Sequence, residues 1–180
     1  METSGDIPKK AVFLDRDGTL IQEVNYLSRV DDLDVFPYTH EALKLLKDAG
    51  FLLIVITNQS GIGRGVYDEA AMHSIHAEMQ TRLDELIDAF YFCPHLPCDG
   101  CNCRKPLLGM IESAASDFAI DIAGSWVIGD KKIDVETARN AGARSGMVMT
   151  GYGRAHSKEL IAMPDVLGET LLDVVREVLR

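Results

Sequence analysis

The stretch Lys10-Ala11-Val12-Phe13-Leu14-Asp15-Arg16-Asp17-Gly18-Thr19-Leu20 determines the expected fold. It joins an apolar run of strand length directly to a polar loop that begins with two aspartates. The run is apolar at successive positions rather than at alternate ones, which is typical of a strand covered on both faces of a parallel sheet. The residues after such a strand lie at its carboxyl end, where open α/β sheets bind their ligands.

Apolar runs and helical periodicity alternate along the rest of the chain. The spacing predicts an α/β fold, with a central parallel sheet of five or six strands and helices on both faces. Gly50 and Gly142 are expected helix stops, and Asp68 is a possible N-cap. Strands are expected over 10–14, 51–56, 89–92, 125–128 and 146–149, and helices over 39–49, 68–87, 108–118, 133–141 and 169–178.

Length and composition limit the classes of function. The chain has 180 residues, of which 47% are hydrophobic, so it can bury the core of one domain. A net charge of −10 argues against binding to nucleic acid or to an anionic membrane surface. No apolar run approaches the roughly 20 residues that cross a bilayer, and residues 1–10 show no signal peptide. We therefore expect a cytoplasmic monomer with a small-molecule partner.

Acidic residues follow two of the expected strands at the same edge of the sheet. Asp15 and Asp17 follow the first strand, and Asp130 follows the fourth. Three carboxylates this close would repel one another, and a hard divalent cation such as Mg²⁺ would relieve the repulsion. For Asp15 and Asp17 taken alone, two solvated loop aspartates are an equally good interpretation.

Thr57 and Lys105 add a hydroxyl and a positive charge at the same edge. Together with a metal and loop amides they would form a cradle for a transferring phosphoryl group. One carboxylate could then attack phosphorus, and the other could serve as acid and base. Taken singly, Thr57 is better explained as a turn hydroxyl and Lys105 as a surface charge, so the hypothesis depends on their combination.

All four cysteines of the chain lie within residues 93–103, together with one histidine. Five soft ligands in so short a segment favour a tetrahedral Zn²⁺ site over free thiols or a redox pair. Spacing alone favours Cys98 and Cys101 as two of the ligands. The metal would have a structural role, because it would shape the loop that leads into Arg104 and Lys105.

Four ordered motifs resemble those of the haloacid dehalogenase (HAD) superfamily of phosphohydrolases. They are Asp15-Arg16-Asp17-Gly18-Thr19, Ile56-Thr57-Asn58-Gln59, Arg104-Lys105-Pro106 and Ile128-Gly129-Asp130 with the following Lys131 to Asp134. The resemblance implies a Rossmann-like HAD fold with Asp15 as nucleophile and Asp17 as acid and base. It also implies that Thr57 and Lys105 stabilise the phosphoryl group. Mg²⁺ would be held by Asp15, Asp130 and the backbone carbonyl of Asp17, with Asp134 in support.

The cysteine segment resembles the zinc loop of two groups in this superfamily, the D-glycero-D-manno-heptose 1,7-bisphosphate 7-phosphatases and bacterial histidinol-phosphatases. This resemblance implies Cys93, His95, Cys101 and Cys103 as zinc ligands and leaves Cys98 spare. It also implies one phosphatase domain over residues 1–180, with the zinc loop at 93–103 as an insertion. The segments after the first two motifs are too short to fold into a large cap domain.

The first two motifs and the residues near them are more similar to the heptose group. The expected reaction is Mg²⁺-dependent hydrolysis of the C7 phosphate of a heptose bisphosphate through an aspartyl-phosphate, in the biosynthesis of nucleotide-activated heptose. Histidinol phosphate is the alternative substrate. Arg104 would bind the second phosphate, because a guanidinium group can donate two parallel hydrogen bonds to phosphate oxygens. The residues expected to contact the substrate are Glu23, Val24, Asn25, Tyr26, Asn58, Gln59, Ser60 and Arg104.

Two interpretations from other classes compete with a phosphatase. A phospho-accepting signalling domain also gathers aspartates, a threonine and a lysine around Mg²⁺, but its accepting aspartate normally follows a later strand. A zinc module that binds nucleic acid is disfavoured by the acidic charge. His73 and His76 have a metal-like spacing, yet a solvated helix face explains them better, and Met72 and Met79 are expected in the core.

Overall fold

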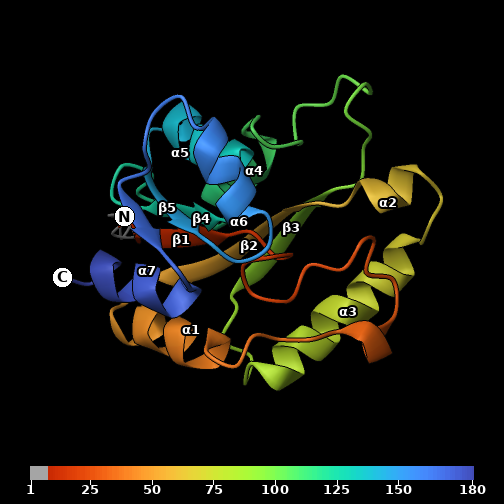
Figure 1. The fold of residues 1–180 in the computed structure, drawn as a ribbon, viewed down its shortest axis with the longest axis horizontal. Helices are drawn as coiled ribbons and strands as arrows, with labels where there is room; N and C mark the ends of the chain where they lie inside the picture. Colours follow the sequence, from red (N-terminus) through yellow and green to blue (C-terminus); the bar gives the residue numbers. More distant parts are fainter. Residues whose placement is uncertain (1–7) are drawn as a thin grey trace, which may run out of the picture.

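The structure is a computed structural model that describes residues 8–180. The expected absence of a signal peptide concerns mainly residues 1–7, which lie outside the described residues. Six parallel strands form one sheet in the order β3-β2-β1-β4-β5-β6 (Figure 1). The strands are β1 (Ala11–Leu14), β2 (Leu52–Asn58), β3 (Ala89–Cys93), β4 (Trp126–Gly129), β5 (Arg144–Val148) and β6 (Val166–Gly168).

Helices cover both faces of this sheet, as the sequence predicted. On one face lie α1 (Thr39–Asp48), α3 (Glu69–Arg82) and α7 (Leu171–Val178), and on the other lie α4 (Gly109–Asp117) and α5 (Lys132–Ala141) (Figure 1). Four short elements complete the fold: the helices α2 (Ser60–Gly63) and α6 (Gly153–His156), and the 3-10 turns η1 (Val30–Asp32) and η2 (Ser157–Glu159). In the described part of the chain, no helix combines the length and the apolar character needed to cross a membrane.

The continuous apolar run of β1 divides between two cores. Val12 and Leu14 belong to a buried cluster with Leu43 of α1, whereas Phe13 belongs to a second cluster with Ile111 of α4. Side chains along a strand point to opposite faces in turn, so a strand between two helix layers needs an apolar residue at every position. This confirms the parallel sheet that the sequence predicted.

Two details differ from the prediction. The helix expected over 68–87 is α3, which ends at Arg82 because Asp84 and Glu85 adopt positive φ angles of 49° and 55°. Asp68 is its N-cap, as expected, and accepts a hydrogen bond from the backbone N–H of Ala71. The strand β6 was missed because its three residues are too short to show a pattern.

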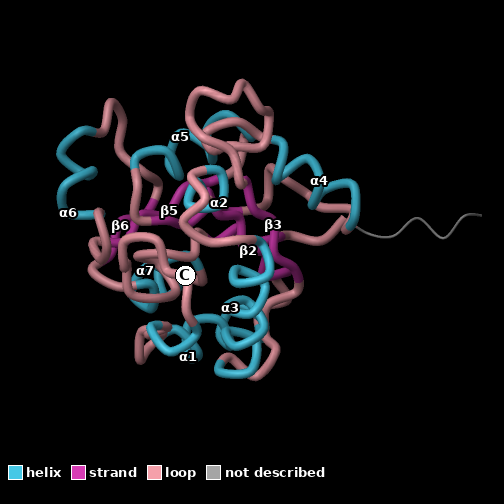
Figure 2. Tube along the Cα trace, turned by 90° about the vertical axis from the view of Figure 1, so that its right-hand side faces the viewer, coloured by secondary structure: helices cyan, strands magenta, loops and turns pink. Residues whose placement is uncertain are grey.

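The strand order brings distant loops together. Since β1 lies between β2 and β4, the residues after these strands share one edge of the sheet. Figure 2 views the molecule from this edge, where loops and α2 lie in front of the strands. Asp15 follows β1, Asn58 ends β2 and Asp130 follows β4, so the polar residues of three motifs converge here.

Candidate active site

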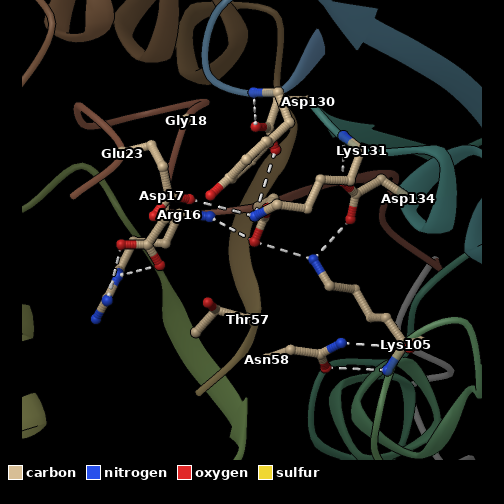
Figure 3. A network of polar contacts seen from close by, with 12 residues as sticks. Arg16, Asp17, Gly18, Glu23, Thr57, Asn58, Lys105, Asp130, Lys131 and Asp134 are labelled. Carbon is tan, nitrogen blue, oxygen red and sulfur yellow. Dashed lines mark hydrogen bonds and ion pairs between the residues drawn. The ribbon is translucent and has the colours of Figure 1, made fainter. Parts of the chain in front are cut away.

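Asp15 is buried at this edge, directly after β1. Its backbone N–H donates to the carbonyl of Ile128 in β4 at 2.9 Å. The Nζ of Lys105 lies 3.0 Å from its Oδ1, and the Nζ of Lys131 lies 3.8 Å from its Oδ2. Figure 3 shows both lysines in the polar network that also contains Asp130 and Asp134. Burial alone would raise the pKa of Asp15, but the two ammonium groups outweigh it and lower that pKa below its ordinary value. Asp15 is therefore ionised, which is the form a nucleophile needs.

Lys105 is buried between two carboxylates. Besides Asp15, its Nζ contacts Oδ1 of Asp134 at 2.7 Å. Burial lowers the pKa of Lys105, but Asp134 and Asp15 raise it above its ordinary value, so the ammonium stays charged. Asn58 holds the backbone in place, since its Oδ1 accepts from the N–H of Lys105 at 3.0 Å and its Nδ2 donates to the carbonyl at 3.2 Å. The charge of Lys105 thus has a fixed position beside Asp15.

Asp130 lies between two glycines. A Cβ on Gly18 would meet its Oδ2 at 2.3 Å, and a Cβ on Gly151 would meet the same atom at 2.2 Å. Both glycines have positive φ, 84° and 53° respectively, a backbone conformation that residues with a side chain rarely adopt. Oδ2 accepts the backbone N–H of Tyr152 at 2.8 Å, whereas Oδ1 has no hydrogen-bond partner among the described residues. Burial, with repulsion from Asp15, raises the pKa of Asp130 to about 8.

This carboxylate group fits a hard divalent cation. One oxygen each of Asp15, Asp130 and Asp134 lies within 4.8 Å of the others. Asp134 is already engaged, because its Oδ1 contacts Lys105 and its Oδ2 accepts the N–H of Lys131 at 3.0 Å. The buried Oδ1 of Asp130 has no hydrogen-bond partner among the described residues, and its nearest cation, the Nζ of Lys131, is 3.8 Å away. Asp130 and the adjacent Asp15 therefore offer the oxygen ligands that Mg²⁺ prefers.

The side chain of Asp17 lies next to this carboxylate group but is hydrogen-bonded to Arg16 and Gln59. The carboxylate trio contains Asp134 rather than the side chain of Asp17. Asp17 instead accepts three hydrogen bonds: Arg16 donates its Nε to Oδ2 at 3.0 Å and its Nη2 to Oδ1 at 2.9 Å, and Gln59 donates its Nε2 to Oδ2 at 2.9 Å. The expected contact of a metal with the backbone carbonyl of Asp17 stays a prediction.

Gln59 connects Asp17 to the next strand end. Its Nε2 also donates to Oγ1 of the buried Thr57 at 2.8 Å, and the hydroxyl of Tyr67 donates to its Oε1. Burial raises the pKa of Tyr67 to about 12, so this hydroxyl keeps its proton and can donate. Thr57 therefore sits in a buried polar network, which rules out its interpretation as a simple turn hydroxyl.

The structure contradicts the expectation that His76 lies on a solvated helix face. His76 is 5% exposed, and its Nε2 lies 3.2 Å from Nη1 of the buried Arg16. Burial, with a contribution from the positive charge of Arg16, lowers the pKa of His76 to about 3. His73 is exposed, as expected, and Met72 and Met79 are in the core. The period of α3 places residue 76, but not residue 73, on the buried side with these methionines.

A cavity of about 330 Å³ opens over these groups. Every residue expected to contact the substrate lines it, as do Asp15, Asp17, Thr57 and Lys105. Glu23 reaches Lys131, whose Nζ is 3.4 Å from its Oε2. The lining residues that the sequence analysis missed are Arg16, Leu27, Gly61, Tyr67, Lys131, Ile133, Tyr152 and His156. Of these, Lys131 could have been found, because it directly follows Asp130 in the fourth motif.

The structure brings together the four zinc ligands that the resemblance implied. The Sγ of Cys93 lies 3.6 Å from the Sγ of Cys101 and 3.0 Å from that of Cys103. The Nδ1 of His95 lies 3.2 Å from the Sγ of Cys103. Sulfurs about 3.8 Å apart would be expected around a tetrahedral zinc with bonds of about 2.3 Å. Cys98, which spacing alone favoured, is exposed and is not part of this group.

The zinc-ligand cluster is connected to the cavity through Arg104. This residue follows Cys103 directly, and its Nη1 donates to the carbonyl of His95 at 3.2 Å. Both Arg104 and the adjacent Lys105 line the cavity. The shape of the cysteine loop therefore affects where two cations of the candidate active site lie.

Comparisons with known proteins agree with this geometry. Residues 102–174 match the family model described as HAD-hydrolase-like. The chain is 40% identical to the D-glycero-beta-D-manno-heptose-1,7-bisphosphate 7-phosphatase of Haemophilus ducreyi, over 93% of this chain and 97% of that protein. It is 38% identical to the D-glycero-D-manno-heptose-1,7-bisphosphate 7-phosphatase of Thermosynechococcus vestitus, over 94% and 95% of the two chains.

A solved structure is similar at the level of the whole fold. The crystal structure of the D,D-heptose 1,7-bisphosphate phosphatase from B. bronchiseptica superposes with a TM-score of 0.88 at 34% identity, covering 94% of this chain and 98% of that chain. That protein was crystallised in complex with magnesium and phosphate. The corresponding enzyme from Burkholderia thailandensis gives a TM-score of 0.72 at 30% identity, over 95% and 99% of the two chains.

Proposed function

The chain belongs to the heptose-1,7-bisphosphate 7-phosphatase family of HAD-like hydrolases, and on this premise we propose that it removes the C7 phosphate of D-glycero-D-manno-heptose 1,7-bisphosphate. One observation supports the proposal for this chain's own residues: the carboxylate of the buried Asp15 lies 3.0 Å from the ammonium of Lys105, and both residues line a cavity of about 330 Å³. A carboxylate nucleophile and a cation that binds the phosphoryl oxygens are the two groups that the reaction needs first.

Asp15 and Asp130 would hold Mg²⁺, with the backbone carbonyl of Asp17 as a further ligand. The Oδ1 of Asp130, which accepts no hydrogen bond from the described residues, supports this assignment, as does the magnesium bound by the B. bronchiseptica enzyme. When bound, the metal supplies positive charge that lowers the repulsion between the phosphate and Asp15. Asp134 would keep Lys105 in place rather than bind the metal.

The reaction divides between the two aspartates of the first motif. A carboxylate oxygen of Asp15 attacks phosphorus, the bond between phosphorus and the C7 oxygen breaks, and that oxygen takes a proton from the carboxyl group of Asp17. Water then attacks the phosphorus of the aspartyl-phosphate, Asp17 takes a proton from this water, and Asp15 is released with inorganic phosphate. Each group thus returns to its starting state.

Lys105 and Thr57 would stabilise the phosphoryl group during both steps. The ammonium of Lys105 is fixed by Asp134 and by the contacts of its backbone with Asn58, so it does not have to reorganise as charge develops. Glu23 to Tyr26 and Asn58 to Ser60 would contact the sugar, and Arg104 would bind the C1 phosphate. The guanidinium can bind two phosphate oxygens at once.

The substrate assignment is tested by phosphate release in the presence of Mg²⁺. We expect kcat/KM for the heptose 1,7-bisphosphate to exceed that for histidinol phosphate by about 100-fold or more, because Arg104 has no second phosphate to bind in the latter. Analysis of the product by ³¹P NMR should show that the C7 phosphate is lost and the C1 phosphate retained. A preference for histidinol phosphate would instead identify the alternative activity.

Cys93, His95, Cys101 and Cys103 would hold one structural Zn²⁺. We expect Cys103→Ala to lose bound zinc and to lower the free energy of unfolding by about 2 kcal/mol or more, because a structural metal adds its binding energy to folding. Phosphate release should also fall, since Arg104 and Lys105 follow this loop. Metal analysis by mass spectrometry and thermal melting measure the two effects.

Cys98→Ala is the matched control for the zinc site, because Cys98 lies on the same loop but outside the ligand cluster. It should retain one zinc per chain, the melting temperature and the activity. Zinc lost from Cys98→Ala but retained by Cys103→Ala would contradict the ligand set and would support the pair that spacing alone favours.

Residues 1–180 would form one phosphatase domain with the zinc loop at 93–103 as its insertion, and the domain would act as a monomer on this small molecule. Sedimentation velocity would test it: a single species of about 20 kDa is expected, compared with 19.8 kDa for the chain.

A further inference from the structure

Arg16, between the two aspartates of the first motif, is an unusual buried cation. Its side chain is 1% exposed and is the largest of the fully buried side chains in the described residues. A buried guanidinium needs partners, because an unpaired charge in a protein interior is costly. Arg16 has two partners: Asp17, which accepts from Nε and Nη2, and His76, which lies at Nη1.

The contact between Arg16 and His76 has only one possible direction. A guanidinium has five N–H donors and no acceptor, so the Nε2 of His76 must accept at 3.2 Å. The imidazole is therefore neutral and carries its proton on Nδ1. The ring is fixed in this orientation, since it stacks on Phe90 of β3 with the centroids 4.4 Å apart and 19° between the planes.

The contact between Arg16 and His76 affects the carboxylate of Asp17, as the hydrogen bonds of Asp17 show. Arg16 and Gln59 donate three hydrogen bonds to its carboxylate, which has about four lone-pair sites in all. One site remains for the proton that Asp17 exchanges with the leaving group and with water. Its direction depends on the orientation of the guanidinium of Arg16, and this orientation depends on His76.

We propose that His76 is a positioning residue for the acid and base of the reaction: it fixes the guanidinium of Arg16, which in turn aims the carboxyl of Asp17 at the ester oxygen. This inference rests on the proposed function, because it requires Asp17 to protonate a leaving group. His76 itself does not line the cavity and touches the reaction only through Arg16.

The test compares two phosphate esters that differ in their need for an acid. The C7 ester is an alkyl phosphate whose leaving oxygen must be protonated, whereas p-nitrophenyl phosphate releases a stable phenolate without help. In His76→Phe, which keeps an aromatic ring on Phe90 but has no acceptor, we expect kcat/KM for the heptose bisphosphate to fall roughly 10- to 100-fold. For p-nitrophenyl phosphate it should fall less than about threefold.

Two further variants make the result specific. His76→Gln restores an acceptor oxygen at a similar distance along the side chain, so it should recover most of the loss on the heptose bisphosphate. Ser74→Ala is the control, because Ser74 lies on the same helix, is exposed and donates its hydroxyl within the helix to the carbonyl of Ala70. If His76→Phe does not fold, His76→Leu gives the same test, since it also removes the acceptor beside Nη1 of Arg16 and leaves Arg16 and Asp17 unchanged.

The outcomes separate this inference from the proposed function. Wild-type protein that hydrolyses neither ester contradicts the proposed function. Wild-type activity with equal losses on both esters in His76→Phe, or no recovery in His76→Gln, would mean that His76 is only structural. On the heptose bisphosphate alone, a loss in kcat with KM unchanged and recovery by Gln supports positioning, and a loss confined to KM contradicts it.

Discussion

Replacing Asp15 by asparagine is expected to reduce phosphate release from the heptose bisphosphate by about 10⁴-fold or more, since an amide cannot replace the carboxylate that is proposed to attack phosphorus. The amide of asparagine has nearly the same shape as the carboxylate. Its oxygen can still accept the hydrogen bond that the backbone N–H of Arg16 donates to Oδ1 of Asp15 at 2.9 Å. What the variant lacks is the negative charge and the nucleophilic oxygen. Steady-state phosphate release measures the loss.

The same substitution should leave the fold intact. Lys105 keeps its contact with Asp134, and Asp130 is freed from the repulsion of Asp15, which together with burial raises its pKa. Asp130 can then ionise more readily, and its negative charge partly replaces the one that Asp15 contributes in the wild type. We expect the melting temperature of Asp15→Asn to change by only a few degrees, and Asp48→Asn, at an exposed position, to resemble the wild type in both measurements. Activity near the wild-type level in Asp15→Asn would refute its role as nucleophile.

Replacing Lys105 by methionine is expected to harm both stability and activity. The ammonium lies 3.0 Å from Asp15 and 2.7 Å from Asp134, and all three side chains are buried. Removing one partner of a buried charge network leaves the others uncompensated, which typically costs about 3–5 kcal/mol. Phosphate release should fall by about 100-fold or more, because the phosphoryl oxygens lose a preorganised cation. Chemical denaturation and phosphate release measure the two effects.

A second substitution separates these effects. Asp134→Asn added to Lys105→Met removes one of the uncompensated charges, so part of the lost stability should return while activity stays low. Lys132→Met is the matched control, because Lys132 is partly exposed and, within residues 8–180, forms an ion pair only with Glu136, at 3.8 Å. If Lys105→Met is as stable and as active as this control, Lys105 does not have the role assigned to it.

The layered fold was predictable because its strands are apolar at consecutive positions. In β1 this pattern supplies Val12 to one core and Phe13 to the other, so the sequence alone shows that both faces are covered. The residues of the site were predictable because they follow those strands. The grouping of Cys93, His95, Cys101 and Cys103 was predicted by resemblance, since spacing alone favoured Cys98, which the fold leaves exposed.

What the sequence could not show depends on contacts between distant segments. The pairing of Asp134 with Lys105 joins residues 29 positions apart, and that of Arg16 with His76 joins residues 60 positions apart. A histidine on a helix of polar and apolar residues gives no sign that it meets a buried guanidinium. β6 was missed for a different reason, since a strand of three residues at the edge of a sheet has too few positions to display a period.

The narrow space around Asp130 depends on contacts between distant parts of the chain. Gly18 and Gly151 approach this carboxylate from opposite ends of the chain, and Thr150 donates its hydroxyl to the carbonyl of Gly18 across 132 positions. The surroundings of Asp130 are therefore complete only when the segment after β5 lies against the first loop. A side chain at either glycine would collide with the carboxylate, so both positions are closed to larger residues.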